Sequence, residues 1–114
     1  MTTARRALGS SGEDAAAAWY EANGYRILAR NWRCRQGEID LVLRRGRTIV
    51  FCEVKTRTSA AFGAPIEAVT RTKQLRLRAL AARWLAESTT PAGEIRFDVV
   101  SVLAGELEVL EGAF

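Results

Sequence analysis

The stretch GEIDLVLRRGRTIVFCEVK, residues 37–55, decides the fold of this chain. It contains two runs of alternating apolar residues, Glu38 to Arg44 and Thr48 to Lys55, on either side of Gly46-Arg47. A period of two is typical of strands, and a two-residue connection that begins with glycine favours a tight hairpin turn. We therefore predict an antiparallel hairpin centred on Gly46-Arg47.

Centring the hairpin on this turn fixes which residues face each other. The predicted pairs on one face are Arg44 with Ile49, Val42 with Phe51, Asp40 with Glu53, and Glu38 with Lys55. The pairs on the other face are Ile39 with Val54, Leu41 with Cys52, and Leu43 with Val50. The second set is entirely apolar, and a slip of one residue would move it to the opposite face, so the pattern supports this register.

The same register brings acidic side chains together at one end of the hairpin. Like charges that face each other destabilise a sheet, so Asp40 opposite Glu53 needs compensation. Mg²⁺ can supply it, because this ion prefers oxygen ligands and is typically held by one or two carboxylates. Lys55 projects from the same face, where an ammonium can offset charge that develops on a phosphate. In this interpretation Glu38 is the ion-pair partner of Lys55.

A plainer alternative fits the spacing equally well. Glu38 and Lys55 then form an ordinary cross-strand ion pair, and Asp40 and Glu53 are solvated at the end of a sheet. Spacing alone does not decide between the two interpretations.

The rest of the chain predicts further helices and strands. Ser10-Ser11-Gly12-Glu13 has the form of a capping box, so we predict a flexible tail over residues 1–9 and then a helix that stops at Asn23-Gly24. The other predicted elements are a strand over Tyr25–Trp32, a connection over Cys34–Gly37, a loop over Ala60–Pro65, a helix from about Glu67 or Thr70 to Glu87, and strands over Ile95–Leu103 and Glu106–Leu110. This order predicts a single α/β domain over residues 1–114, with a mixed central sheet flanked by helices.

Composition narrows the chemistry. The 114 residues include no histidine, which excludes histidine acid–base catalysis and histidine-ligated zinc, and Cys34 and Cys52 lack the spacing of a zinc site. A net charge of +4 favours a polyanionic partner such as nucleic acid. No run approaches the roughly 20 apolar residues of a membrane span, and no apolar signal segment follows the first residues, so we expect a cytoplasmic protein with no membrane partner.

These features together resemble the PD-(D/E)XK nuclease superfamily, and more closely the bacterial YraN family, whose members are similar to archaeal Holliday-junction resolvases. The residues that carry the resemblance are Gly12-Glu13, Asn31, Gly37 to Leu41, Phe51 to Arg57, Phe62-Gly63, Lys73 and Arg96 to Val100. One departure is Ile39, which stands where the superfamily has its namesake proline.

The resemblance implies a restriction-endonuclease-like fold and a metal-dependent endonuclease that hydrolyses phosphodiester bonds in DNA, with branched DNA among its substrates. It implies that Asp40 and Glu53 bind Mg²⁺ or Mn²⁺, that Lys55 assists the attacking water or the phosphate, and that Glu13 is an acidic helper from the first helix. The alternative is a nucleic-acid-binding module that keeps the nuclease fold without turnover. By analogy with resolvases, a homodimer is a further expectation.

Several charged residues keep two interpretations at this stage. Glu13 is either the capping-box partner of Ser10 or a catalytic acid. Asp98 is either structural or approaches the site from a neighbouring strand. The candidates for contacts with nucleic acid phosphates, whose alternative is a solvated surface, are Arg57, Lys73, Arg71 and Arg76.

Overall fold

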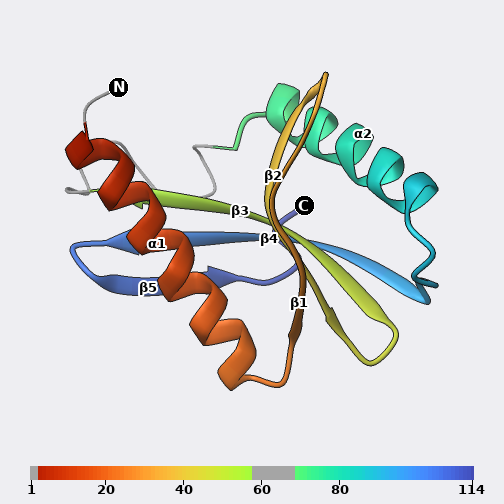
Figure 1. The fold of residues 1–114 in the computed structure, drawn as a ribbon, viewed down its shortest axis with the longest axis horizontal. Helices are drawn as coiled ribbons and strands as arrows, with labels where there is room; N and C mark the ends of the chain where they lie inside the picture. The colour runs from red at the N-terminus through yellow and green to blue at the C-terminus, as the bar shows by residue number, and fades with distance from the viewer. Residues whose placement is uncertain (1–2, 58–68) are drawn as a thin grey trace.

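The computed structural model describes residues 3–57 and 69–114, which form a five-stranded sheet with two helices (Figure 1). The elements are α1 (Thr3–Ala22), β1 (Arg26–Cys34), β2 (Gly37–Arg45), β3 (Thr48–Arg57), α2 (Arg71–Glu87), β4 (Glu94–Leu103) and β5 (Glu106–Leu110). The strand order is β1-β2-β3-β4-β5, and every neighbouring pair is antiparallel except β3 with β4. The predicted α/β fold with a mixed sheet is confirmed, and it is consistent with a restriction-endonuclease-like fold.

The two helices cover opposite faces of the sheet. Strand residues alternate between the two faces, so Leu41 and Leu43 pack into a cluster with α1 while Val42 packs into a cluster with α2. Parallel strands need a long crossover, and α2 lies within the connection from β3 to β4. The α1 cluster consists of Ala16, Ala17, Tyr20, Tyr25, Leu41, Leu43, Val50, Cys52, Val100 and Val102. The α2 cluster includes Ile39, Val42, Ile49, Phe51, Leu77, Leu80, Ala81, Trp84, Phe97 and Val99.

The predicted hairpin register is confirmed near the turn. The ladder between β2 and β3 runs from the pair Arg45 with Thr48 to the pair Leu41 with Cys52. The ladder includes neither Asp40 with Glu53 nor Glu38 with Lys55, although β3 continues beside β4 as far as Arg57. The two hairpin strands therefore separate just where the acidic residues begin.

The bounds of α1 and β1 differ from the predicted ones. Helix α1 begins at Thr3, so the prediction that Ser10 starts this helix as a capping box is wrong, and most of the predicted tail is helical. Strand β1 extends to Cys34, which shortens the predicted connection. Helix α2 begins after Thr70, whose side chain accepts a hydrogen bond from the Lys73 N–H, so the second proposed start is confirmed. The predicted loop over Ala60–Pro65 lies outside the described residues.

Asp98 on β4 is a structural carboxylate. Its side chain is fully buried and accepts hydrogen bonds from the Tyr20 hydroxyl at 2.7 Å, the Gly112 N–H at 3.0 Å, and two nitrogens of Arg96 at 2.8 and 2.9 Å. Arg96 also donates to the Tyr25 hydroxyl at 2.8 Å. This network joins α1, β4 and the C-terminal segment, and it settles the question that the sequence left open for Asp98.

Candidate metal and phosphate site

Asp40 lies at the point where β2 leaves β3. Its Oδ2 atom accepts a hydrogen bond from the Val54 N–H at 2.8 Å, so the side chain takes the place of the next ladder bond. The backbone also turns here, because Ile39 packs in the α2 cluster while Leu41 packs in the α1 cluster. The prediction that Ile39 and Leu41 share a face is therefore wrong, since the strict period of two requires a regular strand. Asp40 lines a pocket at this point together with residues of β3 and α2.

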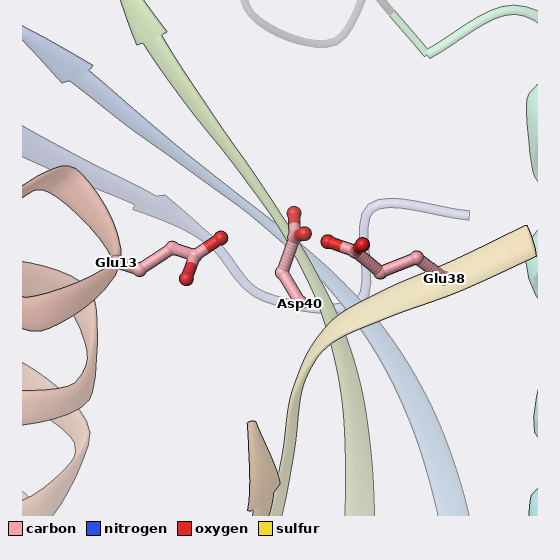
Figure 2. A group of neighbouring side chains, drawn as sticks. All are labelled: Glu13, Glu38 and Asp40. Atoms are coloured by element: carbon pink, nitrogen blue, oxygen red, sulfur yellow. The ribbon is translucent and has the colours of Figure 1, made fainter. Parts of the chain in front are cut away.

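Three carboxylates meet at this point, as Figure 2 shows. Glu13 reaches in from α1, while Asp40 and Glu38 come from β2. One oxygen from each side chain lies within 4.8 Å of the others, and all three residues are half-buried. An all-oxygen donor set of this kind suits a hard divalent cation such as Mg²⁺ or Mn²⁺. The sequence did not assign Glu38 to this cluster, although its position two residues before Asp40 was a usable signal.

Glu13 is positioned by its neighbours on the sheet. The Asn31 side chain on β1 donates a hydrogen bond to Glu13 Oε2 at 2.9 Å. Gly12 lets α1 approach β3 closely, because a Cβ at this position would clash with the Thr56 hydroxyl oxygen. Since α1 begins at Thr3, Glu13 lies well inside the helix and is not the third residue of a capping box. The capping interpretation of Glu13 is therefore wrong.

The crowding of acids changes the protonation of Asp40. Burial, followed by the negative charge of Glu53, raises the pKa of Asp40 from its ordinary value of 3.8 to about 8. The charge of Glu13 and a hydrogen bond with Glu38 act in the same direction, while the hydrogen bond from Val54 opposes them. Asp40 therefore keeps a proton near neutral pH unless a cation enters the site.

The ion pairs around the cluster differ from the predicted ones. Lys55 Nζ lies 2.9 Å from Glu53 Oε1, and Arg33 Nε lies 2.8 Å from Glu38 Oε2. The prediction that Glu38 pairs with Lys55 is wrong, because the hairpin ladder ends before these residues while Glu38 stays paired with Arg33 across β1 and β2. Burial acts to lower the pKa of Lys55, but the hydrogen bond and charge of Glu53 outweigh it and raise this pKa overall.

A pocket of about 290 Å³ joins these acids to basic residues of α2. It is lined by Gly37, Glu38, Asp40, Glu53, Lys55, Lys73, Arg76, Leu77 and Leu80. Lys73 lies close enough to Lys55 that the positive charge of Lys55 lowers the pKa of Lys73. Two neighbouring ammonium groups beside a set of carboxylates suit a ligand that contains both a cation and an anion. The predicted inward position of Lys73 is confirmed.

The other two predicted phosphate contacts lie outside this pocket. Arg71 is an exposed residue at the start of α2. Arg57, at the end of β3, lines a second pocket of about 230 Å³ together with Ser11, Gly12 and Thr56. The structure thus places Lys73 and Arg76 beside the acids, and Arg57 and Arg71 away from them.

Among the described residues, neither helix combines the length and apolar character that a membrane span requires.

The mixed sheet, the covering helices and the carboxylate-lined pocket define a class: α/β proteins consistent with a restriction-endonuclease-like fold. Within this class, the chain belongs to the uncharacterised protein family UPF0102, the YraN family, whose model matches residues 12–102.

Two relatives show how much of the chain this family shares. A UPF0102 protein of Beutenbergia cavernae is 56% identical over 114 residues, which cover 96% of this chain and 97% of the relative. A UPF0102 protein of Moorella thermoacetica is 50% identical over 121 aligned positions, which cover both chains completely. The predicted family is confirmed, and the names of these relatives state no activity.

Proposed function

We propose that this protein is a metal-dependent endonuclease that hydrolyses phosphodiester bonds in DNA. The observation that carries the proposal is that one pocket contains both acidic and cationic groups. The carboxylates are those of Glu38, Asp40 and Glu53. The cationic groups beside them are those of Lys55, Lys73 and Arg76. A phosphodiester with a bound divalent cation needs both kinds of group at once. The resemblance to resolvases further suggests branched DNA as a substrate.

Asp40 and Glu53 are the proposed metal ligands. Asp40 belongs to the carboxylate cluster with Glu13 and Glu38, whereas Glu53 lies outside that cluster, lines the same pocket as Asp40 and acts on Asp40 through its charge. The residues fit a hard cation, because the donors are all carboxylate oxygens and because burial, together with the charge of Glu53, raises the pKa of Asp40 to about 8. When bound, Mg²⁺ or Mn²⁺ would polarise the phosphate and make an attacking water more acidic. The carboxylates would determine where the cation, and therefore its positive charge, lies in the pocket.

The lysines act on the anionic part of the substrate. Lys55 is positioned by its contact with Glu53, and its raised pKa keeps the ammonium charged at neutral pH. A charged donor in this place stabilises negative charge that develops on the phosphate. Lys73 and Arg76 stand on the same side of the pocket, one helical turn apart on α2, and would bind phosphate oxygens.

The more distant basic residues fit a longer polyanion. Arg71 at the start of α2 and Arg57 at the end of β3 lie outside the pocket, and phosphate contacts at such positions would make binding fall as salt rises. A homodimer would offer two such sites to a branched substrate, which is the expectation taken from the resolvases.

The proposal is tested by incubating purified protein with supercoiled, single-stranded and branched DNA in the presence of Mg²⁺ or Mn²⁺. We expect nicking or cutting that EDTA abolishes and that Asp40→Ala lowers by at least about 100-fold. Asp14→Ala is the matched control, because Asp14 is an exposed acid on the same helix as Glu13 that pairs with Arg30. This control should cut like the wild type.

Two outcomes would contradict the proposal. Cutting retained by Asp40→Ala would show that the site is elsewhere. Salt-dependent DNA binding that persists in EDTA, with no cutting of any DNA form, would favour the nucleic-acid-binding module instead.

A further inference from the structure

Asn31 has an unusual backbone for a strand residue. Its φ is 51°, and among the described residues the other non-glycine position with a positive φ is Ala104. A positive φ disfavours most side chains, and asparagine tolerates it better than most. Asn31 lies within β1 between the residues that pair Arg30 with Leu41 and Trp32 with Ile39. Asp40 lies between the same two pairs on β2, so this conformation occurs directly beside the acidic cluster.

The side chain of Asn31 contacts one member of that cluster. Its Nδ2 donates to Glu13 Oε2 at 2.9 Å, across the gap between β1 and α1. Glutamate has a flexible side chain, and fixing it in one conformation lowers its entropy. Repulsion from Glu38, and from Asp40 when it is ionised, would also favour rotation of Glu13 toward solvent, and a donor opposes that rotation.

The chemistry of the donor matters as well as its position. An amide is neutral, so it can orient the Glu13 carboxylate without neutralising the cluster as an arginine or lysine would. Attachment of α1 to the sheet does not require this contact, because the adjacent Arg30 and Asp14 form an ion pair between the same two elements. A simple tether therefore does not explain both the positive φ and the choice of asparagine.

We propose that Asn31 is a positioning residue that holds the Glu13 carboxylate beside Asp40 for binding of a divalent cation. This inference rests on the proposed metal-dependent function. Residues that hydrogen-bond metal ligands usually change metal affinity by about 10-fold to 100-fold when they are replaced. Asn31 acts through Glu13 and needs no contact of its own with the cation or with DNA.

Asn31→Gly tests the role directly, because glycine accepts the positive φ and removes only the amide. We expect calorimetric titration with Mn²⁺ to show binding about 10-fold or more weaker than in the wild type, with little change in the thermal unfolding midpoint. Asp14→Asn breaks the neighbouring ion pair and is the matched control, which should bind Mn²⁺ as the wild type does. A merely structural role for Asn31 would change unfolding and leave the Mn²⁺ affinity as it is.

A second comparison asks whether Asn31 acts through Glu13. In a Glu13→Ala background, Asn31→Gly should have no further effect on Mn²⁺ affinity. Equal Mn²⁺ binding by wild type and Asn31→Gly would overturn the role of Asn31 and leave the proposed function standing. A wild-type protein that binds no Mn²⁺ would overturn the proposed metal-dependent function, and the role of Asn31 with it.

Discussion

Two aspartates on strands β2 and β4, on either side of β3, have opposite surroundings. Asp98 is fully buried, and donors from Tyr20, Arg96 and Gly112 surround its carboxylate. Asp40 is half-buried among other acids and accepts a hydrogen bond from the Val54 N–H. The arginine beside Asp98 balances its charge, whereas burial and the negative charges of Glu53 and Glu13 disfavour ionisation of Asp40.

This difference separates a carboxylate that stabilises the fold from one that is arranged for binding. A buried acid with a complete set of donors is already compensated and has no capacity for a ligand. A group of crowded acids destabilises the protein by itself, and such strain is typical of sites whose ligand supplies the missing charge. The same chemical change at both positions should therefore have opposite effects.

The largest effect is expected at Asp98. Asp98→Asn removes the negative charge that Arg96 pairs with, and it turns one hydrogen-bond acceptor into a donor that faces other donors. We expect the free energy of unfolding to fall by about 3 to 5 kcal/mol. Urea unfolding followed by circular dichroism would measure it. A loss below about 1 kcal/mol would contradict the structural role of this network.

Asp40→Asn should instead stabilise the metal-free protein. The pKa of Asp40 is about 8 in the folded state against 3.8 ordinarily, so between these pH values the folded state binds more protons than the unfolded state. Stability from this group is therefore complete below about pH 4 and is lost as pH rises to about 8. Because one pKa unit corresponds to about 1.4 kcal/mol, even half of the shift lowers stability by about 2 to 3 kcal/mol.

The measurement is a series of urea unfolding curves from pH 4 to 9 in EDTA. Wild-type stability should decline over this range more steeply than that of Asp40→Asn, and the variant should be the more stable protein at pH 8.5. Addition of Mn²⁺ should reverse the order, because the cation stabilises only a folded state that can bind it. Parallel pH profiles for the two proteins would contradict the raised pKa of Asp40.

Much of this fold could be predicted from local patterns. The turn at Gly46-Arg47 and the alternation around it determined the hairpin register as far as Leu41, because a one-residue slip exposes a whole apolar face. The start of α2 was predicted at Glu67 or Thr70, and Thr70 is the N-cap residue in the structure. The hairpin register and the start of α2 depend on residues close together in the sequence, so a single amino-acid sequence is enough to predict them.

The site was harder to predict, because its geometry depends on a departure from regularity. Extrapolating the register placed Glu38 opposite Lys55, whereas the strands separate at Asp40 and Glu38 pairs with Arg33. The contact between Asn31 and Glu13 joins residues 18 positions apart on different elements. The early start of α1 was missed for a similar reason, since Ser10-Ser11-Gly12-Glu13 resembles a capping box even inside a helix.

The smallest effect is expected at Arg33, and it tests whether Glu38 belongs with the crowded acids. The Arg33 side chain is 76% exposed, so loss of its ion pair with Glu38 in Arg33→Ala should change the free energy of unfolding by less than about 0.5 kcal/mol. The same cation competes with a metal for Glu38, so its removal should tighten Mn²⁺ binding by about twofold, which corresponds to about 0.4 kcal/mol.

Arg35→Ala is the matched control, because it removes an equal charge from an exposed position two residues away. Calorimetric titrations at physiological salt reduce the effect of distant charges on both variants. Tighter Mn²⁺ binding by Arg33→Ala than by Arg35→Ala would indicate that Glu38 belongs to the metal site together with Asp40. Equal affinities would instead mean that Arg33 already compensates Glu38, as Arg96 compensates Asp98, and would restrict the metal site to the remaining acids.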